Sequence, residues 1–200
     1  MSNSSHLPRR EQQRFGRLCR IGMLCFAATF VAPAVQAATT VRVTSATASL
    51  DDGVYELDTQ IAIQLPEEAR RAIDAGLTME LDYEIEIARV RRYVPDAGVA
   101  DLVQSYELSY HALSQRYLLR NRNTGEQQDF GSLQSALDRV SDVRGLPLLD
   151  ASLLEAGARY QFRLRAVLNL RTAPDTLGWL FFWTDDWSAA SEWFEWTHRR

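Results

Sequence analysis

Two adjacent carboxylates, Asp185 and Asp186, are the residues of this sequence best suited to acid–base or metal chemistry. A hydrolase would need both carboxyl groups to face one substrate, and a metal site would need both to converge on one ion. Adjacent residues of an extended chain point to opposite sides, so the pair does not easily share a substrate. A turn or cap role is therefore favoured, and a carboxylate-dependent hydrolase is the least favoured function.

A histidine is the second candidate for chemistry. His111 shares the face of an expected strand with Ser109 and Glu107, two and four residues away. Side chains two residues apart on a strand are separated by about 6.5 Å, too far for a ready-made catalytic triad. The sequence also lacks a glycine-rich phosphate loop, a His-Glu-x-x-His helix and a Gly-x-Ser-x-Gly elbow. We therefore predict no catalytic residue, no metal ligand and no cofactor.

An aromatic segment near the C-terminus favours binding instead. All five tryptophans lie between residues 179 and 196. Tryptophan rings stack on sugars or lie at membrane interfaces, and an exposed aromatic run forms a large apolar patch. The candidate binding residues are Trp179, Phe182, Trp183, Asp186 and Trp187. In the alternative, residues 177–187 close one end of the fold, Trp193 and Trp196 pack in the core, and the structural motif comprises Ser191, Trp193 and Trp196.

The elements that must position these residues are mostly strands. Three long runs alternate apolar and polar side chains with a period of two: Val54–Leu65, Leu77–Ile87 and Arg159–Leu170. Each run therefore has one core face and one wet face, which is typical of antiparallel sheets. We predict an all-β fold, an immunoglobulin-like antiparallel β-sandwich of about seven to nine strands, with a small barrel as the alternative. Weaker strand candidates are Val41–Ser49, Gln104–Leu113, Gln115–Arg122, Glu126–Phe130 and Ser191–His198.

Two or three short helices and one hairpin complete the expected fold. Pro66 and the acids after it are typical of a helix start, and Gly76 is placed to end that helix. Ser132 and Asp150 are candidate N-caps of two more helices. The Asn-Thr-Gly sequence at 123–125 predicts a tight hairpin turn, because Asn and Gly tolerate positive φ.

Charges on the wet faces predict one strand pairing. The run Leu77–Ile87 carries an acidic stripe, and the run Arg159–Leu170 carries a basic one. If the two strands are neighbours, cross-strand ion pairs help to fix their register. The stripes comprise Glu80, Asp82, Glu84 and Glu86 on one run, and Arg159, Arg163 and Arg165 on the other.

The N-terminus predicts export. Residues 1–20 are rich in arginine, residues 21–31 are apolar, and Val35 and Ala37 occupy the −3 and −1 positions of a signal-peptidase site. We predict a cleavable Sec-type signal peptide at 1–37, a single β-sandwich domain at 38–200 and a periplasmic location. An uncleaved leader would instead anchor the chain in the inner membrane. Cys19 and Cys25 both lie in this leader, so the domain has no thiol.

The charge of the domain excludes one class of partner. Residues 38–200 carry 17 arginines, no lysine and 25 acidic side chains. A net negative domain of this size does not bind nucleic acid by neutralising phosphates. We therefore expect no nucleic-acid partner, and membrane contact only through the leader before cleavage.

The ending of the chain resembles a known family. Asp186-Trp187, Ser191, Trp193 and Trp196, with the opening at Leu50–Asp58, resemble the DUF4390 family of exported proteobacterial proteins, often labelled "proline-rich signal peptide protein". The resemblance covers most of residues 38–200 and implies an exported all-β domain without a known activity. Family members are often encoded near a sensor histidine kinase, so the resemblance also implies an envelope or membrane partner such as a sensor kinase.

Together these observations favour a non-enzymatic module in the bacterial envelope that binds a protein or takes part in sensing. The alternative is a small-ligand binder for glycan or lipid that uses Trp179, Trp183 and Trp187. Protein binding needs an exposed apolar patch or a free sheet edge, whereas ligand binding needs an aromatic-lined cleft.

Overall fold

The computed structural model describes residues 38–92, 96–172 and 188–200, and these residues belong to one compact unit. These residues contain ten strands, one more than the upper end of the predicted range, and two α-helices. The strands are β1 (Thr40–Asp51), β2 (Val54–Gln64), β3 (Leu77–Arg89), β4 (Ala97–His111), β5 (Arg116–Asn121), β6 (Gln127–Phe130), β7 (Asp142–Asp150), β8 (Arg159–Thr172), β9 (Ser188–Ala190) and β10 (Phe194–Arg199).

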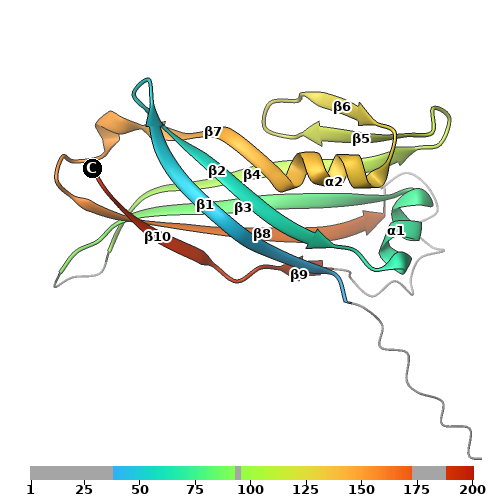
Figure 1. Ribbon diagram of the computed structural model, residues 1–200, viewed down its shortest axis with the longest axis horizontal. Coiled ribbons are helices and arrows are strands. Elements are labelled where there is room, and N and C mark those ends of the chain that lie inside the picture. Colours follow the sequence, from blue (N-terminus) through green and yellow to red (C-terminus); the bar gives the residue numbers. More distant parts are fainter. Residues whose placement is uncertain (1–37, 93–95, 173–187) are drawn as a thin grey trace, which may run out of the picture. The chain divides into compact units, whose positions relative to one another are not determined.

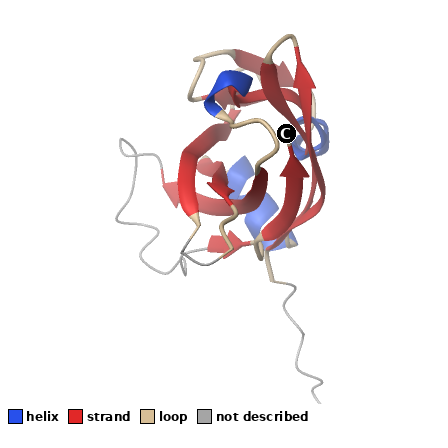
Figure 2. Ribbon diagram, turned by 90° about the vertical axis from the view of Figure 1, so that its left-hand side faces the viewer, coloured by secondary structure: helices blue, strands red, loops and turns tan. Residues whose placement is uncertain are grey.

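The strands form two antiparallel sheets (Figure 1, Figure 2). Sheet A has the order β1-β2-β7, and sheet B has the order β10-β8-β3-β4-β5-β6, with β9 also paired to β8. Neither sheet closes on itself, so the predicted all-β antiparallel sandwich is confirmed and the barrel alternative is wrong.

The alternation in the sequence decides which face of each strand is buried. Along β3 the odd-numbered residues from Leu77 to Ile87 are buried, and the even-numbered ones are half-buried on the outer face. The inner faces of β2 and β8 contribute large side chains such as Tyr55 and Phe162 to the same core. All three strands predicted from this pattern are confirmed, with ends that differ by at most two residues.

The predicted pairing of the acidic and basic stripes is also confirmed. β3 lies beside β8, with Glu84 opposite Arg165 and Glu86 opposite Arg163. Both facing pairs form ion pairs, at 2.6 Å and 2.9 Å respectively. Arg159 lies beyond the end of this ladder and is opposite a residue of β10 instead.

The helices begin where their caps predict. Helix α1 (Glu67–Asp74) follows Pro66, and Gly76 adopts a φ of 107° just after it. Helix α2 (Leu133–Ser141) begins after Ser132, whose Oγ accepts a hydrogen bond from the backbone N–H of Ser135 at 3.1 Å. The third predicted helix is only the short 3-10 turn η1 (Ala151–Leu153). No helix in the described ranges is long and apolar enough to span a membrane.

Two differences from the expected fold have a local cause. β7 was not predicted, because Gly145 and Pro147 interrupt its pattern and its pairing with β2 is irregular. The predicted strand Ser191–His198 begins only at Phe194, as β10, and residues 191–193 separate it from a further short strand, β9, that precedes the predicted range. The chain leaves the sheet between them, and this break shapes the site described next.

Candidate functional site

The candidate binding residues predicted from the aromatic run fall outside the described residues. This applies to Trp179, Phe182, Trp183, Asp186 and Trp187, and to Asp185. The described part of the C-terminal segment begins at Ser188 and contains the three residues of the predicted structural motif: Ser191, Trp193 and Trp196.

Ser191 attaches the segment between β9 and β10 to the neighbouring strand. Its side chain is buried, and its Oγ accepts a hydrogen bond from the backbone N–H of Ala166 at 3.0 Å. The same hydroxyl donates to the carbonyl of Glu192 at 2.8 Å, and the Ser191 N–H donates to the Ala166 carbonyl at 2.8 Å. These bonds fix the point at which the chain turns out of sheet B.

Trp196 packs on the inner face of sheet B. Its ring stacks on Phe162 with centroids 5.4 Å apart and lies 6.0 Å from the ring of Phe194. Trp196 is only half-buried, although its Nε1 is shielded from solvent and has no hydrogen-bond partner among the described residues. The expectation that Trp196 packs against the core is therefore met, but its cover is incomplete.

Trp193 does not pack in the core, which corrects that expectation. Its ring lies 4.5 Å from the guanidinium carbon of Arg163 and 4.7 Å from that of Arg165, within the range of cation–π contacts. Arg163 also lies between Glu86 and Glu195, at 2.9 Å and 3.0 Å. The contact with Glu195 is an ion pair whose Nε–H is not aligned for a hydrogen bond. Trp193 is thus engaged by the charged network of the outer face.

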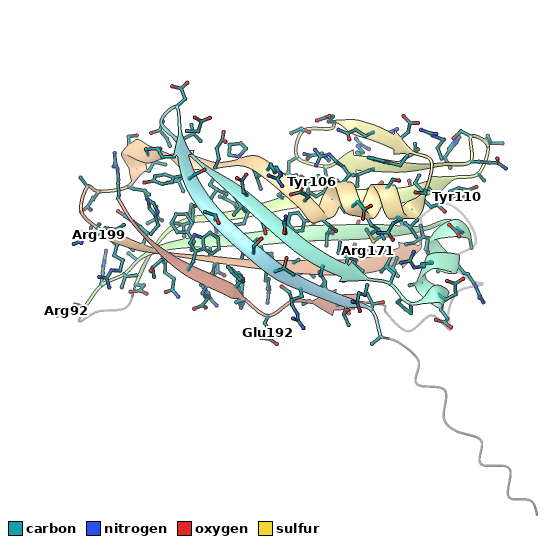
Figure 3. The ribbon with its side chains drawn as sticks, viewed as in Figure 1. Arg92, Tyr106, Tyr110, Arg171, Glu192 and Arg199 are labelled. Atoms are coloured by element: carbon teal, nitrogen blue, oxygen red, sulfur yellow. The ribbon has the colours of Figure 1, made fainter. Side chains whose placement is uncertain are left out.

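A groove lies between β1 and the segment that joins β9 to β10. We call it the β1–β10 groove; its volume is about 330 Å³. Glu192 projects from its rim (Figure 3), and Arg42 is exposed on the wall that β1 provides. The residues that line it are Val41, Arg42, Val43, Ala190, Glu192, Trp193 and Phe194.

One wall of the groove is the edge strand β1, and the other is the segment that joins β9 to β10 at the edge of sheet B. Within the described residues, β1 pairs only with β2, and β10 pairs only with β8. β1 and β10 diverge toward the β1–β2 hairpin (Figure 1). Each strand therefore has one row of backbone N–H and C=O groups that no described strand satisfies, which is the feature that recruits a further strand.

The edge of β1 differs from the other sheet edges. β7 is protected by Pro147 and by irregular pairing, and β6 has only four residues. β10 is six residues long and carries charged side chains. β1 has twelve residues, no proline and, before its final aspartate, a single charge at Arg42. Its one protective device is a β-bulge between Val43 and Ser45.

Sheet A is too narrow to cover sheet B on this side. At the far side, α2 packs against β5 and β6 and covers the part of sheet B that extends beyond sheet A. Beside β1, the inner-face residues Phe194, Trp196 and His198 of β10 are only half-buried. His198 contacts β2 through the Tyr55 hydroxyl, 3.3 Å from its Nε2. Some apolar surface of β10 is therefore left for another segment to cover.

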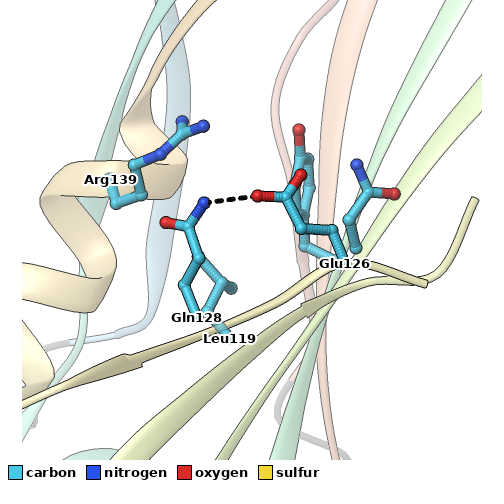
Figure 4. A pocket seen from close by; sticks show the side chains of 6 residues that line it. Leu119, Glu126, Gln128 and Arg139 are labelled. Atoms are coloured by element: carbon cyan, nitrogen blue, oxygen red, sulfur yellow. Dashed lines mark hydrogen bonds between the residues drawn. The ribbon is translucent and has the colours of Figure 1, made fainter. Parts of the chain in front are cut away.

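A second pocket is too small to be a ligand site (Figure 4). Its volume of about 40 Å³ has room for only one or two water molecules. In its wall, the Gln128 amide donates to Glu126 at 2.9 Å, and burial raises the pKa of the Tyr106 hydroxyl. It is lined by Tyr106, Leu119, Asn121, Glu126, Gln128 and Arg139. The pocket is thus a small polar site between α2 and sheet B.

Catalytic chemistry finds no support in the described ranges. His111 is exposed, and its Nδ1 lies 2.8 Å from the Ser114 hydroxyl in the β4–β5 turn. That contact joins two exposed residues of one turn and has no orienting acid. No group of three or more His, Cys, Asp or Glu side chains within these ranges could hold a metal ion.

The groove could not be predicted from sequence periodicity. Val41 and Val43 match the pattern of an ordinary strand, and nothing local shows that they lie beside Phe194. The one available signal was composition, because the long uncharged run at 43–50 is unusual for an edge strand.

Comparison with known proteins identifies a family and no activity. Residues 38–197 match the family described as domain of unknown function (DUF4390). No curated protein and no solved structure matches the chain. The match covers every described strand except the last two residues of β10. The chain therefore belongs to the DUF4390 family, as its C-terminal motif indicated.

Proposed function

We propose that this chain is a non-enzymatic module of the bacterial envelope that binds another protein in the β1–β10 groove. The observation that carries the proposal is the edge of β1, which forms one wall of the groove and pairs with no described strand on that side. Unsatisfied backbone N–H and C=O groups in a row are complementary to the backbone of another polypeptide. Apolar surface at the base of the groove adds a place for the partner's side chains.

A protein partner is favoured over a glycan or a lipid. In the groove a sugar ring would need a free tryptophan face, but the tryptophan that lines it, Trp193, is half-buried and contacts the guanidinium groups of Arg163 and Arg165. The glycan alternative that uses Trp179, Trp183 and Trp187 falls on residues outside the described ranges. A lipid chain would need an apolar groove, but Arg42 and Glu192 lie on opposite walls. A polypeptide fits both features, because its backbone is polar and its side chains can alternate in polarity.

The proposal includes a compartment and a class of partner. Residues 1–37 have the three parts of a signal peptide, which supports export to the periplasm with cleavage after Ala37. The partner is then an envelope or membrane protein, such as the periplasmic part of a sensor kinase. The proposed role is recognition or sensing, with no chemical step.

Site-specific photocrosslinking in the native host tests this proposal. A photoreactive residue replaces Arg42 in the groove, and a matched variant carries it at Asp101, an exposed position on β4. We expect one discrete protein adduct from position 42, lost when Phe194→Ala is added, and none from position 101. Adducts with lipid or glycan alone, or the same adducts from both positions, would refute a protein-binding groove.

A further inference from the structure

In β1, the backbone N–H and C=O groups of every second residue point toward the open side of the sheet. The β1–β2 turn is a two-residue loop in which Asp52 and Gly53 have φ values of 41° and 83°, as in a type I′ turn. The pair that flanks such a turn, Asp51 and Val54, exchanges hydrogen bonds, and every second pair along the ladder repeats this. The backbone groups of the intervening residues of β1 therefore point away from β2.

The residues with outward backbone groups form one continuous row. On the other side of the bulge, β2 continues its alternation of hydrogen-bonded and non-hydrogen-bonded pairs. The backbone groups of Val41 and Val43 therefore also point away from β2. The row comprises Val41, Val43, Ala46, Ala48 and Leu50; the first four side chains pack against the core on the inner face of the sheet, and Leu50, next to the hairpin, is exposed. In a strand added beside this row, the residues opposite these five would have their side chains on the same face of the sheet.

Such a strand would also complete the cover of sheet B. Sheet A ends at β1, while the inner face of β10 leaves Phe194, Trp196 and His198 half-buried. A fourth strand in sheet A would lie over this surface, and every second side chain would point toward it. An extended strand would therefore both pair with the open edge of β1 and cover the exposed apolar surface of β10.

We infer that the partner joins sheet A as a fourth strand, antiparallel to β1, with apolar side chains at every second position facing Phe194 and Trp196. This inference rests on the proposed function and specifies the chemistry of the partner: an extended segment, free of proline, apolar on one face and polar on the other. Antiparallel pairing follows the rest of the sheet, in which every described pair is antiparallel.

A second copy of this chain does not fit the same edge. Pairing of two β1 strands about a two-fold axis would merge both copies of sheet A into one sheet. Both copies of sheet B would then lie on the same face of that sheet. Because sheet B of each copy continues to β10 beside β1, the two β10 strands would crowd together on that face of the merged sheet. We therefore take the occupant to be a segment of another protein.

Hydrogen exchange of the full chain tests the inference, with a short peptide of alternating valine and threonine as the probe. In the free protein, the amides of Ala46, Ala48 and Leu50 should exchange fast, and those of Thr47 and Ser49 should be protected by β2. Millimolar peptide should slow the first group by about tenfold or more, because each amide gains a partner. The second group serves as the internal control.

Two methylated peptides separate strand addition from simple apolar binding. In an antiparallel pair, the valines that face sheet B also direct their N–H groups toward β1. N-methylation of the valines should weaken binding by about tenfold or more, whereas N-methylation of the threonines should leave it unchanged. Equal binding of all peptides, or no protection of Ala48 by any of them, would overturn strand addition. Crosslinking at Arg42 would then still decide whether the groove binds protein.

Discussion

Replacement of Ser191 by alanine tests what positions the groove wall. The Ser191 hydroxyl accepts from the Ala166 N–H at 3.0 Å and donates to the Glu192 carbonyl at 2.8 Å, and the side chain is 8% exposed. Ser191→Ala leaves a buried N–H without its side-chain partner, which costs about 1–3 kcal/mol. We expect a loss of about 2 kcal/mol in the free energy of unfolding, or a fall in Tm of about 4–8 °C for a domain of this length.

Urea unfolding of Ser191→Ala, followed by circular dichroism, measures this loss. The matched control is Ser49→Ala, an exposed serine on the solvent side of β1, which should change the free energy of unfolding by less than about 0.5 kcal/mol. An equal m-value for both variants would show that the unfolded state is unchanged. If Ser191→Ala were as stable as the control, the hydroxyl would not hold the segment between β9 and β10, and the groove wall would need another support.

Three further perturbations test the frame of the fold. Glu84→Arg should lower the free energy of unfolding by about 0.2–1 kcal/mol, and adding Arg165→Glu should restore most of it in thermal unfolding, since the two lie opposite each other. Gly53→Ala should cost about 1 kcal/mol by the same measurement, because its φ of 83° strains a residue with a Cβ. Burial and a hydrogen bond to Asp74 raise the pKa of Tyr117 to about 12, so the native state keeps a proton that the unfolded chain loses above about pH 10. Stability should fall as pH rises from about 10 to about 12, and Tyr117→Phe should reduce that slope in urea titrations.

The parts of the fold that the sequence predicts are those that one strand or one cap determines alone. The alternation from Leu77 to Ile87 requires a buried face, so β3 can be predicted without knowing which strands lie beside it. Ser132 caps α2 through a bond made within four residues of chain. The β3–β8 pairing was also predictable, because opposite charges on two wet faces favour neighbouring strands.

The site depends on information that no single segment contains. Trp193 was expected in the core as a large apolar residue, but it lies in the break between β9 and β10, and its ring contacts Arg163 and Arg165 on the outer face. A local pattern cannot predict that break, because it depends on the bonds between Ser191 and Ala166 in another strand. The width of sheet A also depends on the whole topology. One of its three strands is β7, which the sequence did not predict, so the number of strands could not be known in advance.

The contacts of the three motif residues near the C-terminus all help to set the position of β10 relative to β1. Ser191 attaches the chain to β8, Trp193 is held by arginines of the outer face, and Trp196 stacks on the inner face. A domain that needed only a stable core would gain little from holding an edge strand on both of its faces. The motif makes physical sense if the spacing between β10 and the open edge of β1 must be kept constant, because a strand fits beside β1 only when the surface that it covers lies at sheet-packing distance.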